Sequence, residues 1–248
     1  MDLQTFFREN PKVAIAFSGG ADSAYLLYVA TTYGQEVKAY YVKSQFQPQF
    51  ELDHARRLCK DLSIELCILS LDQLKDPMIR RNDPLRCYYC KKRIFSTILE
   101  AAVKDSYPIL CDGTNADDRE EDRPGFRALR ELQVRSPLRE CDITKEELRR
   151  LSKEAGLFTH DKAAYACLAT RIPIGEEITT EALQVTETAE GILYDMGFRD
   201  FRIRCSQGIP RLQIREVQFP LYREKKEELL AALAPLYKEL WQEPEVRL

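Results

Sequence analysis

The sequence predicts an α/β fold: a Rossmann-like parallel sheet with helices on both faces, followed by a small α+β unit. Short apolar runs alternate with helical patterns through the first part of the chain, which is typical of a parallel sheet. Near Ala155-Gly156 this pattern changes, and two runs of alternating polar and apolar residues follow between two helical segments. We therefore place a first domain over residues 1–160 and a second over residues 161–248.

The first domain is predicted to hold four buried strands and a short fifth one. We expect strands over residues 13–17, 36–42, 64–70, 108–112 and 134–137, and helices over residues 24–30, 49–62, 88–103 and 144–155. Asp22 or Ser23 is expected to cap the helix that starts near residue 24. Because parallel strands need helical crossovers, these helices should cover both faces of the sheet.

The second domain is predicted from one helix, a hairpin and a second helix. We expect helices over residues 181–196 and 224–237, strands over residues 201–205 and 211–215, and an edge strand over residues 246–248. Gln207-Gly208 marks the turn of the hairpin. This order indicates a small α+β unit.

The stretch S-G-G-A-D-S, residues 18–23, lies between the first predicted strand and the first predicted helix. A strand, a glycine turn and a helix N-terminus form an anion site, because backbone N–H groups and the helix dipole both favour negative charge. Gly19 and Gly20 let the backbone approach a phosphate closely. Asp22 is a candidate ligand for Mg²⁺. The stretch lacks the lysine of the G-x-x-x-x-G-K-[ST] loop and the spacing of G-x-G-x-x-G.

Polar or glycine residues follow three of the predicted strands. Ser18, Ser44 and Gly113 stand where these strands end, and ligands of parallel sheets bind beyond the carboxyl ends of the strands. Ser23 adds a hydroxyl donor to the glycine turn. Arg123, in the segment after the loop of residues 112–118, is a candidate for contacting the α-phosphate or the leaving pyrophosphate, with a solvated turn as the alternative.

Three cysteines are candidates for chemistry. Cys87 and Cys90 form a C-x-x-C at a predicted helix start, where the dipole favours thiolate, so they could chelate a metal or form a redox pair. With Cys167 they would supply three ligands to a 4Fe-4S cluster, leaving one iron open for a non-protein ligand such as sulfide. Zinc would want a fourth protein ligand, which is not obvious when the chain has only His54 and His160.

Arg202 and Arg204 alternate with apolar residues, so both should point to one face of the predicted sheet. Two neighbouring guanidinium groups repel each other unless an anion lies between them, and arginine suits a phosphate well. They are candidates for binding a substrate phosphate, with a solvated sheet face as the alternative.

The amino-acid composition indicates which class of protein this is and which partners it is expected to bind. The chain has 248 residues, 44% of them hydrophobic and 31% charged, as is typical of globular proteins. Its net charge is −3, so the basic excess of a nucleic-acid-binding protein is missing and we expect no such partner. No apolar run reaches membrane-spanning length and no leader follows Met1, so we expect a cytoplasmic protein without a membrane partner. The eight cysteines are expected to be thiols or ligands rather than disulfides.

Taken in order, these motifs resemble those of a known family. S-G-G-x-D-S resembles the loop of the PP-loop ATP pyrophosphatases, a fold also called adenine nucleotide alpha hydrolase-like. With D-G-T-N-x-D, R-P-G, C-L-A-T-R-I-P-I-G and the paired arginines, the chain is similar to the LarE family over nearly its whole length. The resemblance implies adenylation of a pyridinium carboxylate mononucleotide by ATP and Mg²⁺, then sulfur insertion for a nickel-pincer cofactor. It also implies that Ser44 and Gly113 lie near the adenosine, and that the protein forms a homo-oligomer, a hexamer.

The resemblance leaves the origin of the sulfur and the substrate open. One branch of the family sacrifices its own cysteine and lacks the C-x-x-C, so Cys87 and Cys90 favour the cluster-bearing branch. Sacrifice of Cys167 is the alternative. Two further readings are a cluster-dependent tRNA thiolase, which the acidic composition disfavours, and a nucleotide-binding regulatory module without turnover, which the intact S-G-G-A-D-S disfavours.

Overall fold

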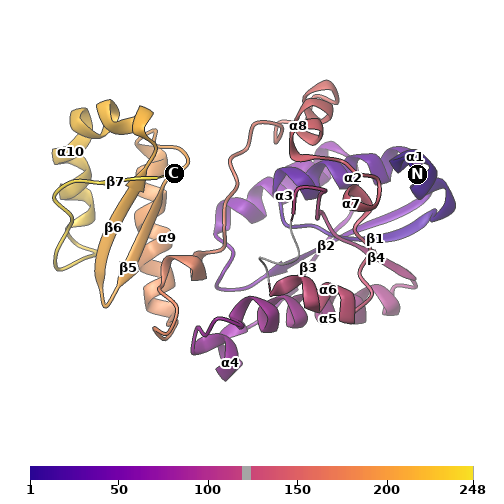
Figure 1. Ribbon diagram of the computed structural model, residues 1–248, viewed down its shortest axis with the longest axis horizontal. Helices are drawn as coiled ribbons and strands as arrows, with labels where there is room; N and C mark the ends of the chain where they lie inside the picture. The colour runs from indigo at the N-terminus through magenta and orange to yellow at the C-terminus, as the bar shows by residue number, and fades with distance from the viewer. Residues whose placement is uncertain (119–123, 248) are drawn as a thin grey trace. The chain divides into compact units, whose positions relative to one another are not determined.

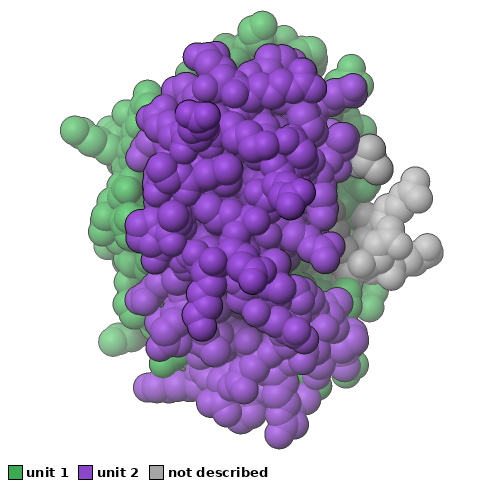
Figure 2. All heavy atoms as spheres, turned by 90° about the vertical axis from the view of Figure 1, so that its left-hand side faces the viewer, with its two compact units in different colours: residues 1–73, 87–162 green, residues 74–86, 163–248 purple. Residues whose placement is uncertain are grey.

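The computed structural model describes residues 1–118 and 124–247 of the chain. The chain divides into two compact units. Unit 1 comprises residues 1–73 and 87–162, and unit 2 comprises residues 74–86 and 163–248; Figure 2 colours them separately. Among the described residues, none of the helices is both long and apolar enough to cross a membrane.

Unit 1 is built on a four-stranded parallel sheet with the order β3-β2-β1-β4. Its strands are β1 Lys12–Ala16, β2 Glu36–Lys43, β3 Leu66–Ser70 and β4 Ile109–Cys111. Its helices are α1 Leu3–Glu9, α2 Ala21–Tyr33, α3 Gln49–Asp61, α5 Arg86–Lys104, α6 Gly125–Glu131, α7 Pro137–Glu140 and α8 Lys145–Glu154. The predicted α/β fold with a parallel sheet is confirmed.

Helices cover both faces of this sheet, with α2 and α8 on one face and α5 and α6 on the other (Figure 1). The side chains of β1 alternate between the faces: Val13 and Ile15 are fully buried among residues of α2, and Ala14 among residues of α5 and α6. A strand buried on both faces reads as a continuous apolar run, which is why the sequence signal was strong here.

Two details of the first unit differ from the sequence prediction. Residues 134–137 form no strand; Arg135 makes only an isolated parallel bridge with Cys111. Gln133 has φ +52°, which turns the chain just before, and Pro137 has no N–H to continue a ladder and begins α7 instead. The predicted cap of α2 is also wrong. Gly20 is the N-cap, Asp22 and Ser23 lie in the first turn, and no side chain caps the helix.

Unit 2 is a small α+β fold around a three-stranded sheet with the order β5-β6-β7. Its strands are β5 Arg202–Ser206, β6 Ile209–Ile214 and β7 Glu245–Val246, and its α-helices are α4 Pro77–Arg80, α9 Thr180–Asp195 and α10 Phe219–Leu233. The hairpin of β5 and β6 is antiparallel, and Gln207 and Gly208 turn it with φ +50° and +79°. Leu193 of α9, Leu229 of α10 and Ile203 of β5 are fully buried in its core.

Candidate functional site

Residues 18–23, between β1 and α2, form a tight glycine turn that ends at a helix N-terminus. Gly19 has φ +79°, and a Cβ atom there would lie 2.7 Å from the backbone oxygen of Glu51, so the turn requires glycine. Gly20 is the N-cap of α2, so the first backbone N–H groups of this helix have no acceptor within it. The turn can therefore accept an anion such as a phosphate.

Two hydroxyl groups hold the shape of this turn. The Oγ atoms of Ser18 and Ser23 lie 3.0 Å apart, and the Ser23 hydroxyl donates to the Gly20 carbonyl at 3.2 Å. The Ser18 backbone N–H donates to Ser23 Oγ at 3.3 Å. Ser23 is buried and Ser18 exposed, so the Ser18 hydroxyl is the one that can reach a ligand.

Asp22 lies in the first turn of α2 and is held by two groups from later in the chain. Its carboxylate forms an ion pair with the ammonium of Lys145 at the start of α8, and accepts a hydrogen bond from Asn115 Nδ2 at 3.1 Å. The Asp22 side chain keeps 25% of its surface exposed. A single carboxylate beside a phosphate site suits Mg²⁺, which binds one or two carboxylates together with substrate phosphates.

The loop after β4 packs directly against this helix start. A Cβ atom at Gly113 would lie 2.8 Å from the backbone nitrogen of Ser23, so glycine is required for the close approach. The preceding carboxyl group, Asp112, is buried and accepts hydrogen bonds from the hydroxyls of Thr114 and Ser136, each at 2.6 Å. Burial raises the pKa of Asp112, although the two hydroxyls act in the opposite direction.

The end of β2 carries a second polar loop. Ser44 is buried, and both its backbone N–H and its hydroxyl donate to Gln47 Oε1, at 3.0 and 2.7 Å. Because β2, β1 and β4 are neighbours in the sheet, Ser44, Ser18 and Gly113 follow three adjacent parallel strands. Arg123 lies outside the described residues.

Lys162 also contacts the glycine turn, and sequence reasoning missed it. Its ammonium donates to the Gly19 carbonyl at 2.9 Å and to Glu51 Oε2 at 2.6 Å. Lys162 is 143 residues from Gly19 in the chain, so no local pattern could have linked them. The only signal was the loop's own lack of a lysine.

Cys87 and Cys90 lie at the start of α5, three residues apart, so their side chains share one face of the helix. Cys87 is exposed and Cys90 is partly buried. Gln73 Nε2 donates to the Cys90 sulfur at 3.4 Å and to its carbonyl at 3.3 Å. Cys59 lies in the core, where burial raises the pKa of its thiol to about 12, as expected for a cysteine with a packing role.

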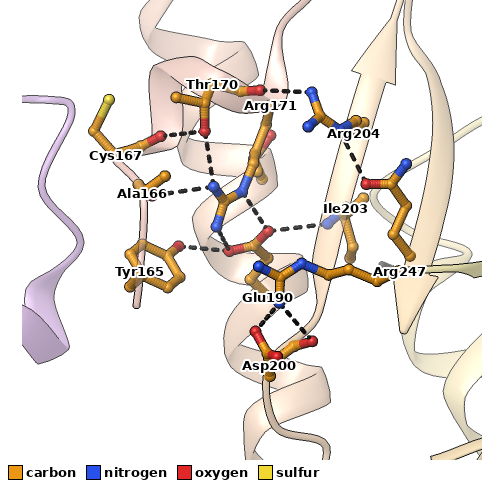
Figure 3. Close-up of polar contacts among 12 residues, drawn as sticks. Tyr165, Ala166, Cys167, Thr170, Arg171, Glu190, Asp200, Ile203, Arg204 and Arg247 are labelled. Carbon is orange, nitrogen blue, oxygen red and sulfur yellow. Dashed lines mark hydrogen bonds and ion pairs between the residues drawn. The ribbon is translucent and has the colours of Figure 1, made fainter. Parts of the chain in front are cut away.

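Cys167 belongs to unit 2 and precedes the 3₁₀ helix η2, Leu168–Arg171. Its carbonyl accepts from the backbone N–H and the hydroxyl of Thr170, at 3.0 and 2.8 Å. The Arg171 guanidinium donates to the side-chain oxygen of Thr170, Oγ1, at 2.9 Å and to the Ala166 carbonyl at 3.0 Å, so it contacts residues on both sides of the cysteine (Figure 3).

A buried carboxylate fixes this arginine. Glu190 of α9 accepts from Arg171 Nε at 2.7 Å and from its NH2 atom at 3.0 Å, and neither side chain is more than 5% exposed. The Tyr165 hydroxyl and the Ile203 backbone N–H donate to the same carboxylate (Figure 3). Burial raises the pKa of Tyr165, and the Glu190 charge acts in the same direction. Glu190 therefore ties the Cys167 segment to β5, which the sequence did not reveal.

The paired arginines lie on one face of β5, as the alternation predicts, because Ile203 between them is fully buried. Arg204 donates from Nε to Gln213 Oε1 at 3.0 Å and from NH1 to the Thr170 carbonyl at 3.3 Å. Partial burial lowers the pKa of Arg202, and the charges of Arg171 and Arg204 lower it further. An anion placed beside these guanidinium groups would relieve their repulsion.

Residues that precede the C-x-x-C in the chain form hydrogen bonds with η2 and the residues after it, within unit 2. Asn82 is fully buried and donates from Nδ2 to the carbonyls of Ile172 and Pro173, at 3.2 and 2.7 Å. Arg86, which directly precedes Cys87 in the chain, donates from NH1 to the Ala169 carbonyl at 2.8 Å and to Asn82 Oδ1 at 2.7 Å. Sequence reasoning also missed these two residues.

Cys87 and Cys90 belong to unit 1 and Cys167 to unit 2. Within residues 1–118 and 124–247, no three or more histidine, cysteine or acidic side chains gather as a metal-binding group. The 4Fe-4S site therefore stays a prediction.

Comparisons with known proteins identify relatives over most of the chain. A sequence model of the family described as "Queuosine biosynthesis protein QueC" matches residues 12–80, which include the glycine turn. The protein slr1717 of Synechocystis sp., uncharacterised, is 36% identical over 214 residues, 86% of this chain and 80% of its own length. The pyridinium-3,5-bisthiocarboxylic acid mononucleotide synthase of Lactiplantibacillus plantarum is 31% identical over 240 residues, 95% of this chain and 87% of its own.

A more distant similarity reaches enzymes that act on RNA. The tRNA-specific 2-thiouridylase MnmA of Pseudothermotoga lettingae is 26% identical over 220 residues, 74% of this chain and 63% of its own length. Its name and that of the mononucleotide synthase both describe products that carry sulfur.

Proposed function

This chain belongs to the LarE family of pyridinium-3,5-bisthiocarboxylic acid mononucleotide synthases, and from that premise we propose its substrate and reaction. It is an ATP-dependent sulfur transferase of the PP-loop type. We propose that it adenylates a pyridinium carboxylate mononucleotide and replaces the activated oxygen with sulfur, giving a thiocarboxylate for nickel-pincer cofactor synthesis.

The proposed reaction has two steps. A carboxylate oxygen of the substrate attacks the α-phosphorus of ATP, so that pyrophosphate leaves and an acyl adenylate forms. A sulfur nucleophile then attacks the acyl carbon, and AMP departs with the original carboxylate oxygen. The glycine turn of residues 18–23 would hold pyrophosphate through its backbone N–H groups, and Asp22 would bind Mg²⁺, which would offset the negative charge of the phosphates.

We propose that Ser44 and Gly113 flank the adenosine and that Arg202 and Arg204 bind the substrate phosphate. The observation that carries the proposal is the contact between Arg204 and the segment of Cys167. Arg204 contacts the Thr170 carbonyl, and Thr170 contacts the Cys167 carbonyl at 2.8 Å from its hydroxyl. A mononucleotide phosphate bound at β5 would therefore be fixed relative to the sulfur-bearing segment of the same unit.

We propose that the transferred sulfur is supplied at a 4Fe-4S cluster held by Cys87, Cys90 and Cys167. The donor set fits such a group, because two cysteines share one helical turn and three thiolates leave one iron open. When bound, the cluster would supply an iron with an open position for sulfide.

The cluster is tested by anaerobic purification followed by iron and acid-labile sulfide analysis. We expect a coloured protein with four irons per chain, and the Cys87→Ser, Cys90→Ser and Cys167→Ser variants should each lose iron. Protein that stays colourless after anaerobic reconstitution, and that loses about 34 Da at Cys167 on turnover, would instead identify a sacrificial cysteine donor.

The substrate is tested by incubating the protein with ATP, Mg²⁺, a sulfide source and pyridinium-3,5-dicarboxylate mononucleotide. We expect a thiocarboxylate product by mass spectrometry, with one AMP and one pyrophosphate for each sulfur inserted. Thiolation of tRNA without product from the mononucleotide would favour the activity named for the 2-thiouridylase relative, which the net charge of −3 disfavours.

We also propose that the protein works as a homo-oligomer, a hexamer, formed through its second domain, residues 161–248. Native mass spectrometry at micromolar concentration tests this: a mass of six chains supports it, and a monomer at all concentrations contradicts it. The cytoplasmic location expected from the sequence remains a prediction.

A further inference from the structure

The Lys162 side chain forms a hydrogen bond with the peptide group between Gly19 and Gly20 in the glycine turn. Its ammonium contacts the Gly19 carbonyl oxygen at 2.9 Å and Glu51 Oε2 at 2.6 Å, and the Phe50 ring lies 5.7 Å from it. The Lys162 and Glu51 side chains are only 13% and 9% exposed. A half-exposed surface lysine would exchange its partners, but this one is enclosed with two strong acceptors.

Lys162 itself is held by the backbone around it. Its own N–H donates to the Thr159 carbonyl at 3.1 Å, and its carbonyl accepts from Arg149 NH2 at 3.3 Å. It is also the last residue of unit 1, five positions before Cys167. The ammonium therefore approaches Gly19 from a fixed point of the first unit.

The direction of the Gly19 carbonyl determines the direction of an N–H donor. In a trans peptide, the C=O and N–H groups point to opposite sides, and no described peptide bond is cis. When Lys162 holds the Gly19 oxygen, the N–H of Gly20 must point away from Lys162. Gly20 is the N-cap of α2, and within the part of the chain that the structure describes its N–H donates one long hydrogen bond, 3.4 Å, to Ser18 Oγ. This N–H is thus available to a phosphate oxygen.

Glycine at position 19 makes this control necessary. Gly19 has φ +79° and no side chain, so the Gly19–Gly20 peptide could rotate more readily than one between larger residues. A peptide flip here would replace the N–H donor with a carbonyl oxygen, which repels phosphate. A hydrogen bond from a charged donor to the carbonyl restrains this peptide more strongly than one from a neutral donor would.

We propose that Lys162 is a positioning residue for pyrophosphate: it holds the Gly19 carbonyl so that the Gly20 N–H faces the β- and γ-phosphates. The inference rests on the proposed use of ATP by this loop and adds a residue to it. Lys162 stands in for the lysine that the loop lacks, but it acts through the backbone and on the opposite side from the anion.

The test compares the affinities of the full-length protein for pyrophosphate and for AMP by isothermal titration calorimetry. Replacing Lys162 alone would leave Glu51 buried without its cation, so the decisive variant is the double Lys162→Met/Glu51→Gln. Its matched control is Glu51→Gln, which keeps the lysine and a carbonyl oxygen to accept its hydrogen bond. Lys162→Arg restores a charged donor, and Lys60→Met changes an exposed lysine on α3.

We expect the double variant to bind pyrophosphate about tenfold to a hundredfold more weakly than Glu51→Gln, since hydrogen bonds to charged groups are worth this much. AMP affinity should be unchanged, because AMP lacks the two phosphates that leave. Lys162→Arg should recover most of the pyrophosphate affinity, and Lys60→Met should match the unaltered protein.

Equal pyrophosphate affinity in the double variant and Glu51→Gln would overturn the proposal. Equal losses for pyrophosphate and AMP would overturn it as well, because they would indicate a general structural role. The proposed function is tested separately. If the unaltered protein binds pyrophosphate but forms no thiocarboxylate, the proposed substrate is wrong and the role of Lys162 is unaffected.

Discussion

The glycine turn of unit 1 and the Cys167 segment of unit 2 are both held by ion pairs, but the two pairs differ in burial. The Asp22 and Lys145 side chains keep 25% and 32% of their surfaces exposed. Arg171 and Glu190 keep 0% and 5%. A partly exposed pair is screened by water, so it contributes less to stability and can be exchanged for Mg²⁺ and phosphate. A buried pair cannot open without leaving an uncompensated charge, so it fixes the backbone. The first region is suited to ligand exchange, and the second to rigid positioning.

Breaking the buried pair should give the largest effect. Glu190→Ala leaves the Arg171 guanidinium buried without its carboxylate, and we expect the free energy of unfolding to fall by about 3–5 kcal/mol. Urea denaturation measures this, with Gln184→Ala on the exposed face of the same helix as the control. A loss no larger than that of the control would show that the pair does not anchor the segment.

A side chain at Gly19 should also have a large effect, and we expect it in the rate of pyrophosphate release rather than in the free energy of unfolding. Gly19→Val places a Cβ atom 2.7 Å from the Glu51 backbone oxygen at φ +79°, so the loop must move. Because a shift of about 1 Å in a binding group can cost about a hundredfold in rate, we expect pyrophosphate release to fall by about a hundredfold or more. Gly191→Val is the control, because nothing lies within 4 Å of a Cβ atom there.

Asp22→Ala should also abolish pyrophosphate release while the protein stays folded, because it removes the carboxylate that we assign to Mg²⁺. Circular dichroism checks the fold, and a coupled pyrophosphate assay checks the activity. Release at the unaltered rate in both Gly19→Val and Asp22→Ala would remove the assigned role of the loop.

The paired arginines should separate the two substrates kinetically. Arg202→Ala and Arg204→Ala should each raise the KM for a phosphorylated substrate by about tenfold or more, since each charge-assisted contact is worth about 1.5–3 kcal/mol. The KM for ATP should change little, because ATP is assigned to the other unit. Arg223→Ala, an exposed arginine of α10, is the control. An unchanged KM for the phosphorylated substrate would leave the pair as a solvated sheet face.

The smallest effect is expected from the pH dependence of stability at Asp112. Burial raises the pKa of this carboxyl group above 3.8, its value in the unfolded chain. The native state therefore holds the proton to higher pH, and stability falls as pH rises through the native pKa, by about 1.4 kcal/mol for each unit of difference. Asp112→Asn should remove this dependence. Unfolding curves that change with pH identically in both proteins would contradict the assignment.

The periodicity of the sequence predicted the elements that carry both regions, because a strand buried on both faces and an amphipathic helix leave local patterns. The glycine turn was also predicted, because the residues that form it are adjacent in the sequence. Glu190, Lys162 and Asn82 were not predicted, because each acts through a contact with residues far away in the chain. The missed turn at Gln133 has a different cause: a positive φ at a residue other than glycine has no clear sequence signal.

The most direct test of the account follows the oxygen of the substrate. The protein is incubated with ATP, Mg²⁺, sulfide and a pyridinium carboxylate mononucleotide whose carboxylates carry ¹⁸O, and the nucleotide product is analysed by mass spectrometry. If the carboxylate attacks the α-phosphorus, each thiocarboxylate formed releases AMP that contains one ¹⁸O atom, together with unlabelled pyrophosphate. Label in orthophosphate, with ADP as the nucleotide product, would contradict adenylation and with it the role assigned to the glycine turn.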